Sequence, residues 1–346
     1  MLRTTYLAIS LIFLFSNFAF ASFFKVGERK HIQIVGSSTV YPFAATIAET
    51  FGRDTDFKTP IVESTGTGGG FKLFCSGTGF GFPDFINASR GIEPSEIKKC
   101  AENGVKEISE IKIGYDGIVL ANSVLGQKYK LTKKQIFLAL AAKVPAKNGN
   151  GLVENFYQKW SDIDATLPQI NIAIYGPPTT SGTRDAFVEL VMEDVCVEIP
   201  EFITAFLDSK IRKKKCHLIR NDGKFIEAGE NDNLIVQKLK NDKNALGIFG
   251  FSFLEENRGS IQPTSINQNL PSFDNIVSGA YPISRPLFIY FKKEHLNLID
   301  GMRQFIAEII STNTIGTDGY LLQKGLIPLT DLELKKVRGE ITKSLN

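Results

Sequence analysis

Three loops rich in glycine, serine and threonine contain the residues best suited to chemistry. Each follows a short apolar run typical of a strand and precedes a helical pattern. A loop in this position leaves backbone N–H groups and hydroxyls free at a helix N-terminus, where the helix dipole favours an anion. Glycine lets the backbone approach such a ligand without a Cβ in the way. The loops are Gly36-Ser37-Ser38-Thr39, Ser64-Thr65-Gly66-Thr67-Gly68-Gly69-Gly70 and Gly176-Pro177-Pro178-Thr179-Thr180-Ser181-Gly182-Thr183.

The side chains in and near these loops indicate a site for an oxyanion. Arg90 and Arg184 could add planar, bidentate positive charge, and Arg184 would lie in the first turn of its helix. We expect Arg184→Ala to cost several kcal/mol of anion affinity, because it removes a charge-assisted hydrogen bond from a desolvated site. The neutral hydroxyl donors are Ser38, Thr39, Thr67, Ser181 and Thr183.

Other chemistries lack their defining residues. Gly66–Phe71 places phenylalanine where a dinucleotide fingerprint needs a small residue, and no Gly-Lys-Ser/Thr completes a Walker A loop. Ser95-Glu96-Ile97-Lys98 matches the S-x-x-K of serine acyl-transfer enzymes, but neither K-T-G nor S-D-N occurs. Ser95 is better explained as the N-cap of a surface helix. The three histidines lie far apart, so the sequence predicts a binding protein without catalytic residues, metal or cofactor.

Alternating strand and helix patterns predict the elements that position the loops. This alternation favours an α/β fold with parallel sheets and helices on both faces. No flexible linker divides the chain, so we expect ordered strands to cross between two lobes at Ile111–Ala121 and Pro286–Phe291. The other expected strands are His31–Val35, Pro60–Glu63, Asp84–Asn87 and Ile170–Tyr175. The expected helices are Tyr41–Phe51, Ser95–Asn103, Thr132–Ala142 capped by Thr132, and one from about Thr183 to Val195.

Composition and length are those of an ordinary globular protein with two domains. The chain has 346 residues, 43% hydrophobic and 22% charged, which excludes a disordered or collagen-like protein. At about 150 residues per domain, this length suggests two domains. The 40 basic and 37 acidic residues give a net charge of only +3. That balance provides no electrostatic footprint for nucleic acid or an anionic membrane surface.

The N-terminus and the cysteines both indicate export. Met1–Ala21 has one charge, an apolar run and a small-x-small end, which is the pattern of a cleaved secretory signal peptide. Its apolar run is too short for a comfortable membrane span. Four cysteines allow three pairings, and the two local ones, Cys75 with Cys100 and Cys196 with Cys216, are favoured. In an oxidising compartment each bridge would stabilise the fold by about 3 kcal/mol.

The loops, taken with their neighbours, resemble periplasmic phosphate-binding proteins of the phosphate ABC transporter. The resemblance spans nearly the whole mature chain in the right order, and Ser181-Gly182-Thr183-Arg184 is its most specific part. The matching segments are Val35-Gly36-Ser37-Ser38-Thr39-Val40-Tyr41-Pro42, Glu63–Lys72, Asp84-Phe85-Ile86-Asn87-Ala88-Ser89-Arg90, Thr180–Phe187, Gly247-Ile248-Phe249-Gly250 and Tyr281-Pro282-Ile283.

The resemblance implies specific ligand contacts, and this sequence departs from the family pattern at two places. Members of the family bind through the first loop, here Ser38, Thr39 and the Val40 N–H, with Thr67 at the hydroxyl position of the second loop. Ser181, Gly182 and Thr183 match the helix N-terminus of the opposite lobe. Some members have an arginine before the S-G-T, where this chain has Pro177 and its neighbours, and Arg184 is expected to replace it.

The second departure concerns the acceptor for the proton of phosphate. Well-known members have an aspartate after A-S, where this chain has Arg90, which could instead pair with a neighbouring carboxylate. A carboxylate acceptor favours a protonated phosphate and repels sulfate, which carries no proton. Asp116, in Gly114-Tyr115-Asp116-Gly117, is our candidate substitute, with a structural cap as its alternative role. Glu63 is the second candidate.

The resemblance also implies a two-lobed, type II binding-protein fold that closes on its ligand. Lobe I would comprise residues 24–114 plus 287–346, and lobe II residues 115–286. The expected function is a periplasmic, monomeric receptor that captures inorganic phosphate and delivers it to a membrane ABC permease. The alternatives are a receptor for sulfate, molybdate or phosphonate, an exported phosphate-ester hydrolase, or a signalling or adhesion protein that reuses the lobes.

Overall fold

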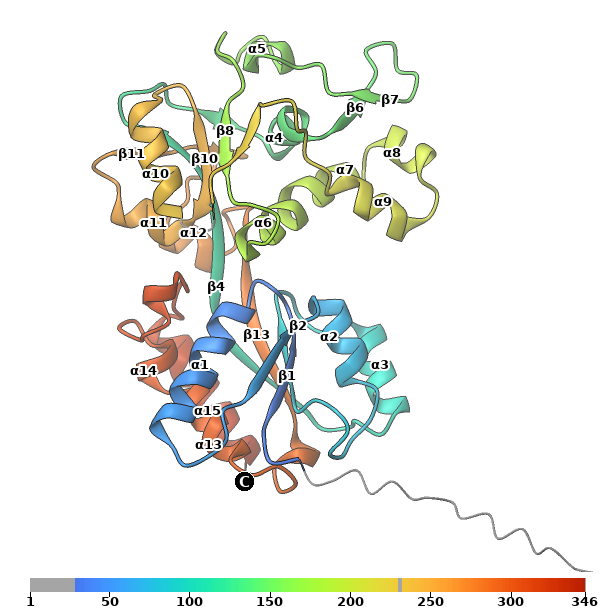
Figure 1. The fold of residues 1–346 in the computed structure, drawn as a ribbon, viewed down its shortest axis with the longest axis vertical. Helices are drawn as coiled ribbons and strands as arrows, with labels where there is room; N and C mark the ends of the chain where they lie inside the picture. The colour runs from blue at the N-terminus through green and yellow to red at the C-terminus, as the bar shows by residue number, and fades with distance from the viewer. Residues whose placement is uncertain (1–28, 230–231, 346) are drawn as a thin grey trace, which may run out of the picture.

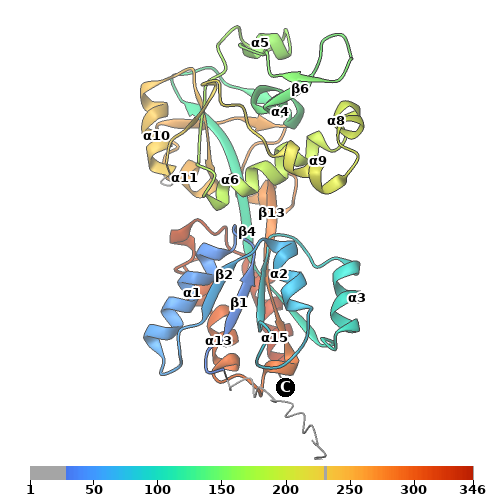
Figure 2. The same cartoon turned by 45° about the vertical axis from the view of Figure 1, so that its right-hand side comes forward.

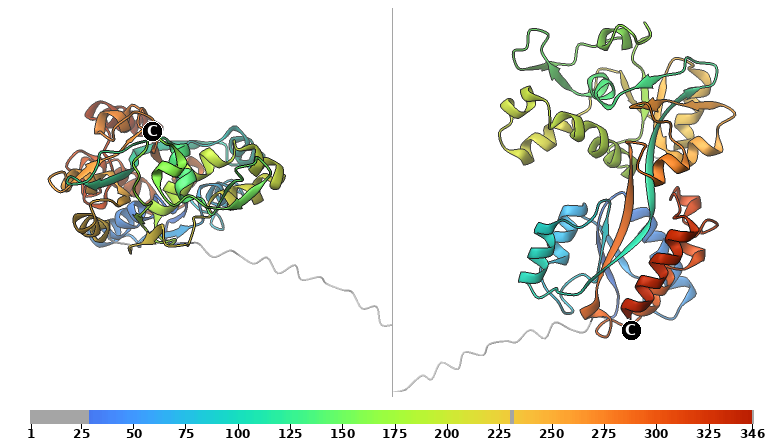
Figure 3. Two further views of the ribbon diagram at one scale, coloured as in Figure 1. Left: turned by 90° about the horizontal axis from the view of Figure 1, so that it is seen from above. Right: turned by 180° about the vertical axis from the view of Figure 1, so that it is seen from behind.

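The protein consists of two lobes joined by two long strands. A computed structural model describes residues 29–229 and 232–345, so the expected signal peptide, Met1–Ala21, lies outside the described residues. Strands β4 (Ile108–Ser123) and β13 (Ser284–Lys292) run from one lobe into the other. Figures 1 and 2 show them side by side at the narrow waist, and the view from behind in Figure 3 shows the same. The expectation of ordered crossing strands is confirmed.

The chain builds one lobe from its two ends and the other from its middle. The C-terminal end lies at the outer tip of the lobe that contains β1 (Figure 1). The elements outside the crossing strands are β1 (Gln33–Gly36), α1 (Tyr41–Asp54), β2 (Ile61–Ser64), α2 (Thr67–Phe74), β3 (Phe85–Ala88), α3 (Pro94–Glu102), η2 (Lys293–His295), α13 (Met302–Ile309), α14 (Thr312–Ile315), η3 (Leu322–Lys324) and α15 (Asp331–Leu345).

The middle of the chain forms the second lobe, at the top of Figure 1. Its elements are β5 (Lys130–Leu131), α4 (Lys133–Leu140), β6 (Lys143–Pro145), β7 (Leu152–Glu154), α5 (Trp160–Ile163), β8 (Ile174–Gly176), α6 (Gly182–Phe187), η1 (Val188–Glu193), α7 (Asp194–Cys196), α8 (Pro200–Ala205), α9 (Ser209–Cys216), β9 (Phe225–Glu227), α10 (Asp232–Asn241), β10 (Leu246–Gly250), α11 (Phe251–Glu256), β11 (Ile261–Pro263), β12 (Ser265–Ile266) and α12 (Phe273–Val277).

A mixed sheet passes through both lobes. Its order is β2-β1-β3-β13-β4-β10-β8-β9, with β11 also paired to β4. Strands β1, β2 and β3 are parallel to one another, as are β10, β8 and β9, whereas β4 and β13 are antiparallel to their neighbours. The 16 residues of β4 pair with β13 along the first part and with β10 and β11 along the second. Most residues of β4 are buried, because helices cover both faces of the sheet.

Local sequence explains the helices that flank the site, with one correction. In α1, Phe43, Ile47 and Phe51 are buried at a spacing of four residues, as the periodicity predicts. The Thr132 hydroxyl accepts a hydrogen bond from the Gln135 N–H and caps α4, as predicted. The prediction of Ser95 as an N-cap is wrong. Glu93 caps α3, because Pro94 fits the first helical position and leaves the capping role to the residue before it.

The cysteines form the two local disulfides that were expected. Cys75 is bonded to Cys100, and Cys196 to Cys216. The first bridge lies in a small core with Phe71, Phe74 and Tyr290, while the main hydrophobic core extends through both lobes. Among the described residues, no helix is both long enough and apolar enough to cross a membrane.

A buried charged cluster closes the outer end of the first lobe. The Asp84 carboxylate accepts two hydrogen bonds from Arg29, at 2.7 and 2.9 Å, and lies 2.6 Å from Nδ1 of His295. The Lys292 ammonium, whose side chain is fully buried, donates to the Gly77 carbonyl at 2.6 Å. Burial opposes the charged form of this amine and lowers the pKa of Lys292 to about 8.

This lysine predicts a specific dependence of stability on pH. Between pH 8 and about 10.5 the unfolded chain keeps a proton on Lys292 that the folded chain loses. The unfolded state therefore binds more protons in this window, and the contribution of Lys292 to stability rises with pH. We expect the free energy of unfolding of the wild type, relative to Lys292→Met, to increase by about 2 kcal/mol from pH 7 to pH 10. Urea denaturation of both proteins would measure it, and parallel pH profiles would contradict the prediction.

Candidate functional site

A cavity of about 380 Å³ lies between the lobes, beside the crossing strands. The first loop contributes Thr39, the third loop contributes Ser181, Gly182 and Thr183, and β4 contributes Asp116. The structure therefore brings together two of the three predicted loops and the candidate carboxylate. The other lining residues are Pro42, Phe43, Asp232, Gly250, Ser252, Phe253, Lys324 and Gly325.

The first and third loops touch each other across the interface between the lobes. Ser181 caps α6, and its hydroxyl accepts a hydrogen bond from the Thr183 N–H at 3.2 Å. A Cβ at Gly182 would lie 3.0 Å from the Ser38 carbonyl oxygen, so a larger residue would push the two loops apart. The Thr39 hydroxyl lies 3.5 Å from the Gly182 carbonyl oxygen. Close approach of the backbones is therefore the reason for glycine at position 182.

Backbone donors face this junction from the first lobe. Val40 is the N-cap of α1, a helix of 14 residues that starts at Tyr41. Among the described residues, the hydrogen bonds include none donated by the amides of Ser38, Thr39 or Val40. Amides at a helix start without a protein acceptor can bind an anion.

Asp116 supplies a carboxylate with an unused hydrogen-bond acceptor. Its side chain is 15% exposed, and its Oδ2 atom is buried without a hydrogen-bond donor among the described residues. Burial raises the pKa of Asp116, and the Arg285 charge opposes that increase. A buried carboxylate oxygen that lacks a donor can accept a proton-bearing ligand group. Glu63, the second candidate, is exposed and lies outside the cavity lining.

Arg285 is a candidate site residue that the sequence analysis missed. It lies on β13 directly opposite Asp116 on β4, and its Nε is 3.9 Å from Asp116 Oδ2. Its guanidinium donates to the Thr39 hydroxyl at 2.9 Å and to the Glu189 carboxylate at 2.5 Å. Its side chain is only 10% exposed. The available signal was its place between Tyr281-Pro282-Ile283 and the predicted crossing strand, but only the strand register directs it to Thr39.

Arg184 occupies a different position from the one expected. Its guanidinium donates to the Pro177 carbonyl at 3.1 Å, lies 4.4 Å from the centre of the Phe225 ring, and is 3.9 Å from Glu227. Burial lowers the pKa of this guanidinium. Neither Arg184 nor Arg285 is among the residues that line the cavity, but Arg285 donates to Thr39, which lines it, whereas the described contacts of Arg184 include no lining residue. In this structure it supports the start of the third loop, while Arg285 carries the charge at the junction.

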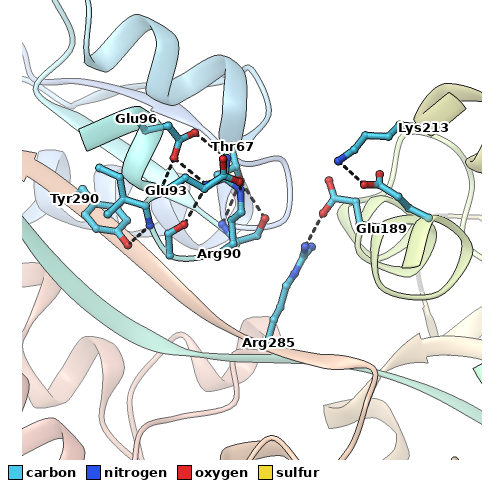
Figure 4. A network of polar contacts seen from close by, with 12 residues as sticks. Thr67, Arg90, Glu93, Glu96, Glu189, Lys213, Arg285 and Tyr290 are labelled. Carbon is cyan, nitrogen blue, oxygen red and sulfur yellow. Dashed lines mark hydrogen bonds and ion pairs between the residues drawn. The ribbon is translucent and has the colours of Figure 1, made fainter. Parts of the chain in front are cut away.

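The second loop and Arg90 lie apart from the cavity. The Thr67 hydroxyl is 3.0 Å from the Ser89 hydroxyl and accepts from the Ser89 N–H. Arg90 forms two hydrogen bonds with Glu96, at 2.9 and 2.7 Å, which is the carboxylate pairing considered as its alternative role. In Figure 4, Thr67, Arg90 and Glu96 lie on one side of the interface and Glu189 and Lys213 of the second lobe on the other, and Arg285 extends between the two groups. The triglycine segment forms the first turns of α2 rather than a loop before it.

Comparisons with known proteins identify the family. Residues 26–313 match the PBP superfamily domain. The protein SphX of Synechococcus elongatus is 30% identical over 273 residues, which cover 77% of this chain and 69% of that protein. This chain belongs to the PBP superfamily and is PstS-like. The phosphate-binding protein PstS of Staphylococcus saprophyticus is 29% identical over 281 residues, covering 80% of this chain and 74% of the relative.

Two solved structures show the same fold. A possible phosphate-binding protein from Planctomyces limnophilus superposes with a TM-score of 0.71 at 24% identity, covering 91% of this chain and 99% of that one. An ABC-type phosphate transport receptor from Vibrio cholerae gives a TM-score of 0.57 at 17% identity, covering 86% and 100%. The predicted two-lobed binding-protein fold is confirmed.

Proposed function

We propose that this protein is an extracytoplasmic receptor that binds inorganic phosphate between its lobes and delivers it to an ABC permease. The observation that carries the proposal is that Thr39 and the donor-free Oδ2 of Asp116 line the interlobe cavity, and that Arg285 donates to the Thr39 hydroxyl. These groups supply a hydroxyl, a positive charge and a proton acceptor, which together match a singly protonated phosphate dianion. The phosphate-binding relatives support the same ligand.

The ligand contacts that we propose combine the sequence and the structure. Ser38, Thr39 and the Val40 N–H would bind from the first lobe, and Ser181, Gly182 and Thr183 from the second. Asp116 would accept the phosphate proton, and Arg285 joins the set as the cation that donates to Thr39. Thr67 and Arg90 would reach the anion only if the lobes approach further, and Arg184 would act through the third loop.

The rest of the proposal concerns how the receptor works. The crossing strands would form the hinge, with the lobes divided at residues 24–114 plus 287–346 and 115–286. We propose a monomer that is exported by a cleaved signal peptide and has no enzymatic activity. Closure around the anion would exclude water and strengthen each hydrogen bond in the cavity.

Calorimetry on the mature protein, stripped of phosphate, tests the proposal. We expect phosphate to bind with a measurable heat and equimolar sulfate to give none under the same conditions. Sulfate is the comparison ligand because it matches phosphate in shape but has no proton to donate to Asp116. Equal or tighter sulfate binding would reassign the receptor to another oxyanion, and no binding of either anion would contradict the oxyanion site.

A further inference from the structure

Two carboxylates of the second lobe accept hydrogen bonds from groups that are proposed to bind the anion. Ser38 Oγ donates to Asp185 Oδ2 at 2.5 Å, and Arg285 Nη1 donates to Glu189 Oε2 at 2.5 Å. Asp185 lies in α6 and Glu189 lies four residues later in η1, so both project from the same side of one continuous helical segment. That segment begins at Ser181-Gly182-Thr183. Figure 4 shows Glu189 pointing toward Arg285 from the second lobe.

We propose that Asp185 and Glu189 are internal competitors of the anion, which occupy its donors while the site is empty. This inference rests on the proposed function. Each carboxylate presents two oxygens to a hydroxyl or guanidinium, as a phosphate would. Binding would then be an exchange, in which phosphate displaces Glu189 from Arg285 and Asp185 from Ser38.

The surroundings of the carboxylates suit such an exchange. The Glu189 side chain is 47% exposed, so the displaced carboxylate can be hydrated without a large penalty. Asp116 differs, because it lies on the crossing strand, its side chain is only 15% exposed and its Oδ2 is buried. Asp185 is half-buried. Glu189 and Asp185 would therefore leave when the anion enters, while Asp116 stays and accepts its proton.

The exchange sets the affinity of the receptor. A donor that is already paired gains less from binding an anion than a free one, because the existing ion pair must first be broken. Removing the competing charge should thus tighten phosphate binding. A residue that merely positions Arg285 for the anion would give the opposite result, because its loss would release the guanidinium from the binding geometry.

Phosphate titrations of Glu189→Gln and a charge-matched control separate these roles. The control is Glu198→Gln, which removes an exposed carboxylate nine residues further along the same lobe and outside the cavity lining. We expect the Kd for phosphate to fall about fivefold in Glu189→Gln, and to remain unchanged in Glu198→Gln. Asp185→Asn should also lower the Kd. An unchanged or higher Kd in Glu189→Gln would overturn the inference.

Thermal denaturation tests the ion pair without relying on phosphate binding. In phosphate-free buffer, Arg285→Gln, Glu189→Gln and the double variant form a mutant cycle. If the Arg285–Glu189 ion pair stabilises the empty protein, the change in Tm of the double variant will differ from the sum of the two single changes. If the ion pair contributes nothing, the change in Tm of the double variant will equal that sum. Additivity would overturn the inference even if the wild type binds phosphate. If the wild type binds no phosphate, the proposed function is wrong. The proposed competition is then wrong as well, even if the mutant cycle shows coupling between Arg285 and Glu189.

Discussion

Arg285→Gln should weaken phosphate binding about 100-fold, corresponding to about 3 kcal/mol of binding free energy. Arg285 is only 10% exposed and is the cation that contacts Thr39 at the junction of the lobes. A charge-assisted hydrogen bond in such a desolvated place is worth more than one at the surface. Glutamine retains a donor and much of the side-chain volume, so the loss measures the charge. Calorimetric titration of the folded variant gives the Kd directly.

Arg184→Gln is the matched comparison for this prediction. Arg184 is also buried, but its guanidinium contacts Pro177, Phe225 and Glu227 rather than the cavity. The structure therefore lowers the effect expected at this position from several kcal/mol to about 1 kcal/mol of binding free energy, with a parallel loss of stability. Equal losses in the two variants would show that Arg184 reaches the anion in the bound state. A normal Kd for Arg285→Gln would remove Arg285 from the proposed site.

Asp116→Asn should reduce the preference for phosphate over sulfate by at least about 100-fold. In the wild type, the Asp116 carboxylate can only accept, so it meets the phosphate O–H favourably and repels sulfate. The asparagine amide offers both an acceptor and a donor and has no charge, so it tolerates sulfate. Competition between the two anions, followed by calorimetry at neutral pH, measures the ratio. A preference equal to that of the wild type would exclude Asp116 as the acceptor.

The pH dependence of selectivity provides an independent check on Asp116. Because burial raises the pKa of this carboxyl, it gains a proton at a higher pH than an ordinary aspartate. A protonated Asp116 no longer repels sulfate, so wild-type selectivity should decrease as the pH falls through this raised pKa. Asp116→Asn should lack this transition. The variant thus separates Asp116 from the titration of phosphate itself, which affects both proteins.

The sequence by itself determined the features that depend on local spacing. Glycine and hydroxyl residues at the ends of strands indicated Gly36–Thr39 and Gly176–Thr183 as loops before helices, and short separations indicated the two disulfides. The long apolar run of Ile111–Ala121 indicated an ordered strand that crosses between the lobes, and it proved to be the central part of β4. The order of the motifs along the chain was enough to indicate the PstS-like family.

Only the tertiary structure decided which charges lie near the cavity. Arg184 follows the most specific motif, but the direction of its helix places the guanidinium against Pro177 and Phe225. Arg285 lies in no predicted loop, yet the antiparallel register of β13 with β4 brings it opposite Asp116 and within reach of Thr39. Arg285 is 169 residues from Asp116 and 246 residues from Thr39 in the sequence. Strand register and helix direction are set by packing over such distances, which residue types and local spacing do not encode.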